Sequence, residues 1–352
     1  MICLETQYFN MNRILLLAVG LWPYQQSNLT RLQFIFFFTI LTTNVIFQIK
    51  DLLEHLQHVC NKLEKNEFAI INEYGCSAKR YTAALMICAI CSLFALIVYE
   101  FCSRIFDILL PMNVSRSHNL PFTMEYFVDQ ETYFYWILLH TNISSYVGAI
   151  VIVGIGTTLI AYLKYICGMI KISSYRIKRA MHINTLKNIK LNNEILVLQG
   201  IISAVNIHRQ AIKLIELLIS KIEKMLFCLI FIGVVSLSLN LFRIFQIATY
   251  GDNIMEILFP SIFVIFCTLY MFIGNYVAQN LTDHNNDFFA VVYDVQWYEA
   301  PLRIQKLILF LLQKGSKKFT ISIGGLFVGS LECFATLVKT SVSYFTVIYS
   351  TQ

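Results

Sequence analysis

The sequence predicts an all-α membrane protein, a bundle of helices that crosses the bilayer several times. Of its 352 residues, 57% are hydrophobic and only 14% are charged, whereas soluble domains average about 45–50% apolar and about 25% charged residues. The mean hydropathy is +0.63. The apolar residues also fall in long uncharged blocks rather than in short periodic stripes. These observations exclude a soluble enzyme and a disordered chain, and the scattered net charge of +6 does not indicate a nucleic-acid partner.

Six blocks of the chain are candidates for crossing the membrane. A transmembrane helix needs about 20 mostly apolar residues to cross about 30 Å of hydrocarbon. The third and sixth blocks are longer than this, so their ends are expected to project from the bilayer. The six predicted spans are Leu32–Ile49, Tyr81–Tyr99, Tyr133–Leu163, Met225–Phe242, Ile257–Ala278 and Phe319–Tyr349.

The loop charges predict the orientation of these spans. Residues 164–224 contain eleven Lys and Arg against three acidic residues, which places that loop on the cytoplasmic side. Residues 102–132 are more acidic and carry the sequon Asn113-Val-Ser115, so Asn113 is a predicted outer glycosylation site. Counting spans from these loops places both chain ends outside, although Arg13 and Arg31 favour a cytoplasmic N-terminus. Six spans therefore leave the topology one span short.

The cytoplasmic segments have helical patterns of their own. In residues 164–224 the apolar residues recur at helical spacing, so the flanking spans are expected to continue as helices. Residues 301–318 predict an amphipathic helix that begins after Pro301 and stops near Gly315. The run Asp283-His284-Asn285-Asn286-Asp287 contains metal-ligand residue types, but its pattern favours a polar break with a helix cap after the fifth span.

No catalytic motif occurs in the sequence, so neither an enzyme nor a cofactor is expected. Glu332 and Lys339 are the ionisable residues of the sixth predicted span, where each costs about 2.5–3.5 kcal/mol on insertion scales. Their seven-residue spacing puts them on one helix face, which predicts a pore or a subunit seam, with a buried polar patch as the alternative. Gly324, Gly325 and Gly329 on the same expected helix favour close helix packing.

Aromatic residues make up 14% of the chain and cluster toward the predicted outer ends of several spans. One interpretation is an interfacial aromatic belt together with ordinary core packing. The other is an apolar pocket within the bundle that suits a small volatile or lipid-like molecule. The residue pattern alone leaves both interpretations open.

Several stretches of the sequence resemble the insect odorant receptors, especially the large group found in ants and wasps. The most specific lie in the C-terminal quarter, where Trp297-Tyr-Glu-Ala-Pro-Leu302 precedes an apolar helix and Ser343-Tyr-Phe-Thr-Val-Ile348 ends the last span. Residues 12–24, which contain Leu-Trp-Pro-Tyr, and Glu125-Tyr-Phe-Val-Asp129 add to the resemblance. It extends over nearly the whole chain.

The resemblance implies a seven-span protein with a cytoplasmic N-terminus and an extracellular C-terminus. Such proteins bind small hydrophobic odorants and form odorant-gated, non-selective cation channels as heterotetramers with a co-receptor, among the lipids of the plasma membrane of olfactory neuron dendrites. The implied organisation is a cytoplasmic segment over residues 1–31 and a transmembrane bundle over 32–282 that includes the loop 164–224. Cytoplasmic anchor helices over 283–318 and a pore-lining span over 319–352 complete it.

The resemblance also implies where odorants bind and where the channel closes. By position in the tail motif, Val347 and Thr351 match gate-forming residues, and Ser350 and Glu332 are assigned to the same pore. Thr351 is polar where the co-receptor has an apolar residue, so this subunit alone does not predict a tight hydrophobic gate. The residues assigned to the odorant pocket are Phe94, Val98, Tyr135, Leu139, Ile143, Tyr146, Phe259 and Phe263.

One departure from the family pattern concerns its second span. Here Phe47-Gln-Ile-Lys50 runs almost directly into Asp51-Leu-Leu-Glu, so the second span is expected to be missing. That loss would explain why counting six spans places the N-terminus outside, and why the chain is short. The alternatives to an odorant receptor subunit are a gustatory-type receptor, a G-protein-coupled chemoreceptor, a small-solute transporter and a non-functional truncated receptor.

Overall fold

The computed structural model describes residues 63–109, 132–186, 191–250, 257–317 and 319–350. The chain divides into two compact units, Met1–Phe68 and Ala69–Gln352. In the first unit, the described residues hold the beginning of helix α4 (Lys65–Leu109), where the Glu67 carboxylate accepts a hydrogen bond from the Glu64 amide at 3.1 Å. The contacts below all lie within the second unit.

Four further long helices follow α4 along the chain, and with α4 they account for five of the six predicted spans. They are α5 (Phe134–Leu186), α6 (Leu191–Tyr250), α7 (Leu258–Asp294) and α9 (Leu331–Ser350). Together with α4, each is long and apolar enough to cross a membrane, which confirms the all-α, multi-pass prediction. The first predicted span, Leu32–Ile49, lies outside the described residues. The short elements are the 3-10 turn η2 (Trp297–Glu299), helix α8 (Leu302–Gly315), β1 (Ser322–Ile323) and β2 (Phe327–Val328).

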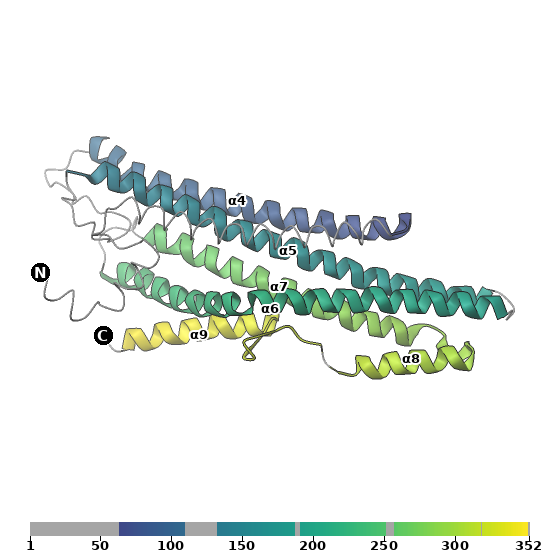
Figure 1. Ribbon diagram of the computed structural model, residues 1–352. Coiled ribbons are helices and arrows are strands. Elements are labelled where there is room, and N and C mark those ends of the chain that lie inside the picture. Colours follow the sequence, from purple (N-terminus) through teal and green to yellow (C-terminus); the bar gives the residue numbers. More distant parts are fainter. Residues whose placement is uncertain (1–62, 110–131, 187–190, 251–256, 318, 351–352) are drawn as a thin grey trace, which may run out of the picture. The chain divides into compact units, whose positions relative to one another are not determined.

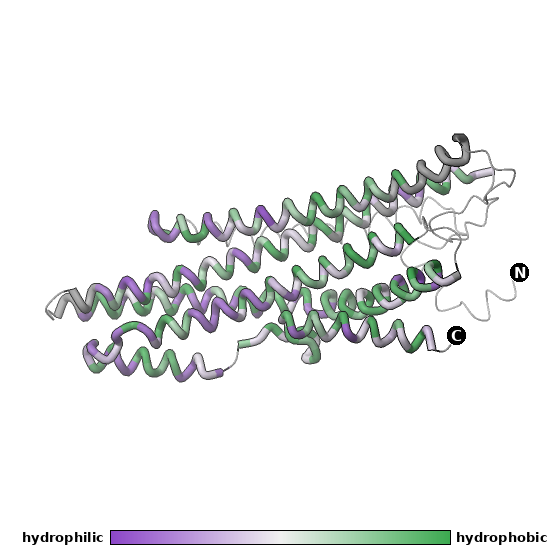
Figure 2. The backbone as a smooth tube through the Cα atoms, turned by 180° about the vertical axis from the view of Figure 1, so that it is seen from behind, coloured by the Kyte–Doolittle hydropathy of each residue, from purple (hydrophilic) through white to green (hydrophobic). Residues whose placement is uncertain are grey.

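Helices α5 and α6 continue well past the thickness of a bilayer. Their 53 and 60 residues correspond to about 80 and 90 Å at 1.5 Å per residue, against about 30 Å of hydrocarbon. They run side by side with α7, as Figure 1 shows. The continuation confirms that the spans extend as helices into residues 164–186 and 191–224. Figure 2 shows hydrophilic residues concentrated in these continuations and hydrophobic residues in the opposite halves of the two helices.

A tightly packed core joins the Lys- and Arg-rich parts of α5 and α6, which lie within residues 164–224, to the C-terminal part of α7 and to α8. We call it the basic core, and the halves of the helices that form it the basic halves. Ile170 and Ile177 of α5, Phe288 of α7 and Ile308 of α8 are all fully buried. Polar bonds fix the register between helices, because the Ser173 hydroxyl donates to the carbonyl oxygen of Ala204 at 2.7 Å. The region is therefore built like the interior of a soluble helical protein.

The polar run from Asp283 to Asp287 does not break the helix, contrary to the sequence prediction. Helix α7 continues through it to Asp294. Asn285 is buried and its Oδ1 lies 3.0 Å from Nε2 of His208, whose ring stacks on Phe288 at 4.2 Å. His284 lies 2.6 Å from the Tyr74 hydroxyl. His284 and Asn285 thus bind neighbouring helices, and Asp283, Asn286 and Asp287 lie on the exposed face of the same continuous helix.

The predicted last span, Phe319–Tyr349, is also wrong at its start, because α9 begins only at Leu331. Residues before it form a short antiparallel hairpin in which Ser322 pairs with Val328 and Ile323 pairs with Phe327. Gly324 and Gly325 make its turn with φ of 63° and 68°, a left-handed backbone that favours glycine. These two glycines therefore form a turn and do not mark a site of close helix packing.

Candidate functional site: the apolar cavity and the last helix

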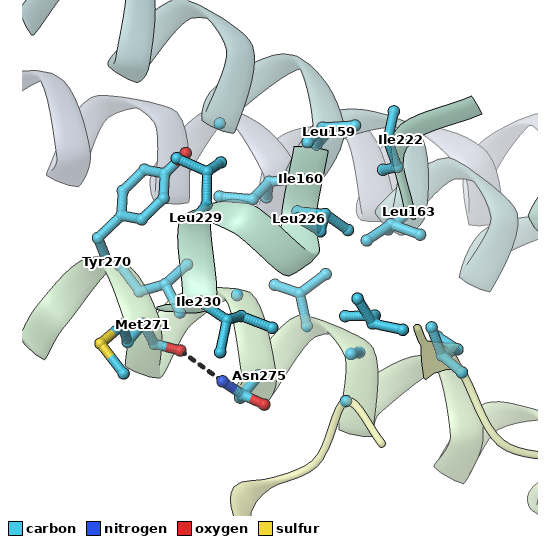
Figure 3. Close-up of a pocket in the computed structure, with 18 of the residues that line it drawn as sticks. Leu159, Ile160, Leu163, Ile222, Leu226, Leu229, Ile230, Tyr270, Met271 and Asn275 are labelled. Atoms are coloured by element: carbon cyan, nitrogen blue, oxygen red, sulfur yellow. Dashed lines mark hydrogen bonds between the residues drawn. The ribbon is translucent and has the colours of Figure 1, made fainter. Parts of the chain in front are cut away.

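An apolar cavity of about 170 Å³ lies where α5, α6 and α7 meet the hairpin and α9. Figure 3 shows Leu159, Ile160 and Leu163 of α5 together with Tyr270 and Met271 of α7 around it. Its walls carry hydrocarbon almost throughout, and its polar side chains are those of Tyr270 and Asn275. The complete lining is Leu85, Gly156, Leu159, Ile160, Leu163, Leu218, Ile219, Ile222, Leu226, Leu229, Ile230, Tyr270, Met271, Ile273, Gly274, Asn275, Val277, Ala278, Ile321, Ile323, Gly329 and Leu337.

Two glycines shape the cavity in opposite ways. A Cβ atom at Gly156 would lie 2.8 Å from the hydroxyl oxygen of Tyr270, so the missing side chain lets that ring pack against α5. A Cβ atom at Gly274 would meet no heavy atom within 4 Å. The first glycine permits a close contact, and the second leaves open space at the cavity wall.

Asn275 connects the cavity to the beginning of α9. Its side-chain amide donates to the carbonyl oxygen of Met271 at 3.0 Å, and its Oδ1 accepts a bond from the Ser330 amide at 3.3 Å. Ser330 in turn caps α9, because its hydroxyl accepts a bond from the Cys333 amide at 3.0 Å. The N-terminus of the last helix is therefore held by a side chain of α7.

A second bond ties the hairpin to α6. The Gly324 amide donates to Oε1 of Glu223 at 2.8 Å. At the base of the hairpin, the Gly329 amide donates to the carbonyl oxygen of Ile321 at 2.9 Å. A Cβ atom at Gly329 would lie only 2.6 Å from Cβ of Ala278, so the hairpin approaches α7 closely. The hairpin thus connects α6 and α7 to the start of α9.

One face of α9 is buried and the opposite face is polar. Leu337 and Ser341 are buried, and the carbonyl oxygen of Ser341 accepts a bond from the Ser238 hydroxyl of α6 at 3.0 Å. A stripe of exposed polar residues at heptad spacing runs along the other face. Its members, which we call the α9 polar stripe, are Glu332, Thr336, Lys339, Ser343, Thr346 and Ser350.

A buried lysine lies close to the cavity on its basic side. Lys164 is only 5% exposed, and its Nζ donates to Oδ1 of Asn280 at 3.3 Å. The same ammonium lies 5.1 and 6.0 Å from the ring centroids of Tyr81 and Tyr276, within the range of a cation–π interaction. Among the described residues, no carboxylate forms an ion pair with it. Two aromatic faces and an amide therefore stabilise this charge.

A family model described as "7tm Odorant receptor" matches residues 27–342 of the chain. This chain belongs to the odorant receptor family. That membership agrees with the multi-pass helical fold, and it confirms the family resemblance seen in the sequence.

Individual odorant receptors match over shorter stretches. Odorant receptor 22c of Drosophila melanogaster is 31% identical over 80 residues, which are 23% of this chain and 19% of that protein. Odorant receptor 10 of Aedes albopictus is 22% identical over 149 residues, 41% of this chain and 40% of that protein. The matched stretches thus span less than half the length of either curated relative.

Solved structures of an insect olfactory receptor share the fold. The structure of OR5 from Machilis hrabei in complex with eugenol has a TM-score of 0.65, with 86% of this chain and 75% of that chain covered. A second structure of the same receptor has a TM-score of 0.56 and covers 99% of both chains. Both are 11% identical to this chain, so they support the helical fold and nothing finer.

The residues predicted to form the odorant pocket do not line the cavity of this structure. They lie on α4, α5 and α7, toward the ends of those helices that are remote from the basic core. Most are exposed in the chain by itself, including Phe94 and Tyr135 at 65% and 71%. Their role stays a prediction. The exposed members are Phe94, Val98, Tyr135, Leu139, Ile143 and Phe263, and the half-buried ones are Tyr146 and Phe259.

The predicted pore residues fall on α9 as far as the structure describes them. Val347 is 55% exposed, Ser350 is the last residue of the helix, and Glu332 lies in its first turn rather than in mid-span. A carboxylate at that position is favoured by the helix dipole, so its cost in the membrane is smaller than the sequence implied. Thr351 and Asn113 lie outside the described residues, as does the junction near residue 50 where the second span is expected to be missing.

Sequence reasoning did not single out the residues that build the cavity. Asn275 stood within a predicted span as a side-chain amide, a residue type that often marks an interhelical hydrogen bond in membrane proteins. The glycine pair at 324–325 was the available signal for a turn.

Proposed function

We propose that this odorant receptor is a subunit of an odorant-gated, non-selective cation channel, assembled with an odorant co-receptor as a heterotetramer in the plasma membrane. The observation that carries the proposal is the α9 polar stripe. The hydroxyls of Thr336, Thr346 and Ser350 already donate to carbonyl oxygens of their own helix. The charges of Glu332 and Lys339 on the same exposed face are costly against lipid, so that face needs water or another subunit beside it. A central pore surrounded by several copies of α9 supplies both.

The opposite face of α9 supports the same assignment. Leu337 and Ser341 fix the helix against α6, and Asn275 fixes its beginning to α7. Val347 lies next to the stripe near the predicted outer end, where an apolar ring can close a pore by dewetting. The proposed gate is therefore Val347 with Thr351, and Ser350 and Glu332 belong to the same conduction path.

Odorants are proposed to bind between the helix ends that carry the eight predicted pocket residues. Those residues come from three helices, α4, α5 and α7, and they are aromatic or aliphatic with few polar groups. Small hydrophobic volatiles match such walls. Stronger binding to the open state than to the closed state would then open the channel.

The proposal is tested by current recordings from cells that express the chain with its co-receptor. Odorant-evoked current above that of the co-receptor alone is expected. Lys339→Glu would replace a positive charge in the proposed pore by a negative one, so the permeability of Ca²⁺ relative to Na⁺ is expected to rise several-fold, measured as a shift in reversal potential. Lys306→Glu makes the same charge change on the exposed side of α8 and is the matched control.

An unchanged reversal potential in Lys339→Glu, with current intact, would remove the α9 polar stripe from the conduction path. Current that appears only after a family second span is inserted near residue 50 would instead identify this sequence as a truncated, non-functional receptor.

A further inference from the structure

The cavity is a different place from the proposed odorant site. Along α5, Tyr146 and Gly156 are ten residues apart, which is about 15 Å of helix. Along α7, Phe263 and Tyr270 are seven residues apart, about 10 Å. The cavity lies on the basic side in both cases, next to Lys164, and none of the eight predicted pocket residues lines it. Whatever enters it does not occupy the odorant site.

The lining determines the chemistry of an occupant. The cavity walls carry no charged side chain, and the amide of Asn275 is already bonded on both sides by Met271 and Ser330. The Tyr270 hydroxyl has no hydrogen-bond partner among the described residues, so it is the available partner for one polar atom. The occupant must therefore be uncharged and almost wholly apolar, because a charge or a second polar group would be left unsatisfied.

The volume of this partly open cavity holds about one ring. An engineered apolar cavity of about 150 Å³ stays dry and binds benzene or xenon, and this one measures about 170 Å³. We propose that the cavity is a second ligand site, which binds a small uncharged molecule built on a single hydrocarbon ring.

The site also adjoins the helix proposed to line the pore. Leu337 of α9 and Ile321, Ile323 and Gly329 of the hairpin segment are part of its wall. An occupant therefore contacts the segment that positions the first turn of α9. Binding itself does not depend on the proposed channel function and is measured without it.

The test uses the purified full chain in lipid nanodiscs and 3-phenyl-3-(trifluoromethyl)diazirine, a single-ring photoreactive probe. Mass spectrometry is expected to find labelled residues of the cavity wall, such as Leu226 and Met271, and a tenfold excess of toluene should reduce that labelling at least fivefold. Residues that only face lipid should also be labelled, but toluene should leave their labelling unchanged. Displacement in the unmodified chain decides the proposal without any variant.

Gly274→Leu supplies a second, structural criterion. Gly274 lines the cavity and a Cβ there meets nothing within 4 Å, so a leucine can be accommodated and is expected to compete with the ligand for space. Gly154→Leu is the matched control, because that α5 glycine also faces open space and does not line the cavity. Cavity labelling is expected to fall at least fivefold in Gly274→Leu and to stay unchanged in Gly154→Leu, at equal gel-filtration recovery.

Two results would overturn the proposal. One is cavity labelling that toluene does not displace, as expected from simple partition of the probe into lipid. The other is labelling present in detergent but lost in nanodiscs, which would mean that a lipid acyl chain fills the space. If current recordings fail while displaceable labelling is found, the channel assignment falls and the ligand site stands.

Discussion

Hydrophobic side chains are buried in one half of α5 and exposed in the other half. In the half that ends at Leu186, Ile170 is fully buried among the neighbouring helices, and in the half that begins at Phe134, Ile150 is 69% exposed. Helix α6 shows the contrast less strongly, because Phe231 is 67% exposed in its apolar half but Leu237 there is only 2% exposed, and Ile202 in its basic half is 48% exposed. Along the continuous helix α5, hydrophobic side chains therefore change from packing against other helices to facing outward. We call these two arrangements the two packing rules.

The difference reflects the solvent around each half. In water, large apolar side chains gain free energy by leaving the surface, at about 25 cal/mol per Å² buried. In a bilayer the lipid tails are as apolar as leucine, so an outward-facing isoleucine loses nothing. The basic half is built as a soluble helical bundle, and the apolar half relies on close contacts and hydrogen bonds between helices. The position at which the rule changes, near Lys164 and Asn280, lies beside the cavity.

The largest expected effect comes from one substitution made in both halves. Ile170→Ala should lower the free energy of unfolding by about 2–5 kcal/mol, because it leaves a cavity in a close-packed core. Ile150→Ala on the same helix should cost less than about 1 kcal/mol, since its side chain faces outward. Thermal unfolding in detergent, followed by gel filtration, measures both. Equal losses for the two variants would show that the apolar half has a core of its own.

A side-chain hydrogen bond that joins two elements should stabilise the protein more than one made within a single helix. Asn275→Ala removes the acceptor of the Ser330 amide and weakens the hold of α7 on the capping residue of α9, so it should destabilise by about 1–2 kcal/mol. Asn240→Ala is the control, because Asn240 donates at 2.8 Å to Ser236 of its own helix. Its expected cost is no more than about 0.5 kcal/mol. The same unfolding assay compares them, and a greater loss in Asn240→Ala would contradict this account.

The sequence was sufficient to predict that five of the six spans lie on membrane-length helices, but not the features between them. Hydropathy alone locates five helices because lipid imposes a minimum length and low charge on each. The same scale reads Phe319–Tyr349 as one span, since it gives no weight to the left-handed backbone of Gly324 and Gly325. It also misreads Asp283–Asp287 as a break, because the partners that satisfy this polar run, His208 and Tyr74, are distant in sequence.

The candidate site shows the same limit more strongly. The polar stripe of α9 follows from residue spacing, so Glu332 and Lys339 were recognisable as members of one face. The cavity depends on five helices and a hairpin meeting at one place, and no single segment carries a pattern for it. Gly274 and Gly156 illustrate this, since the same residue type leaves space at one position and permits a tyrosine contact at the other.

The smallest expected effect distinguishes two tyrosines, Tyr162 beside the boundary and Tyr74 in the basic half. The Tyr162 hydroxyl is buried and has no hydrogen-bond partner within the described part of the chain, whereas the Tyr74 hydroxyl lies 2.6 Å from Nε2 of His284. Burying a hydroxyl without a partner is unfavourable, so Tyr162→Phe should stabilise the protein by about 1 kcal/mol. Tyr74→Phe should destabilise it by about the same amount, because it leaves His284 without that bond. Opposite shifts in melting temperature are the expected result. A loss of stability in Tyr162→Phe would mean that its hydroxyl finds a partner in the membrane-embedded protein.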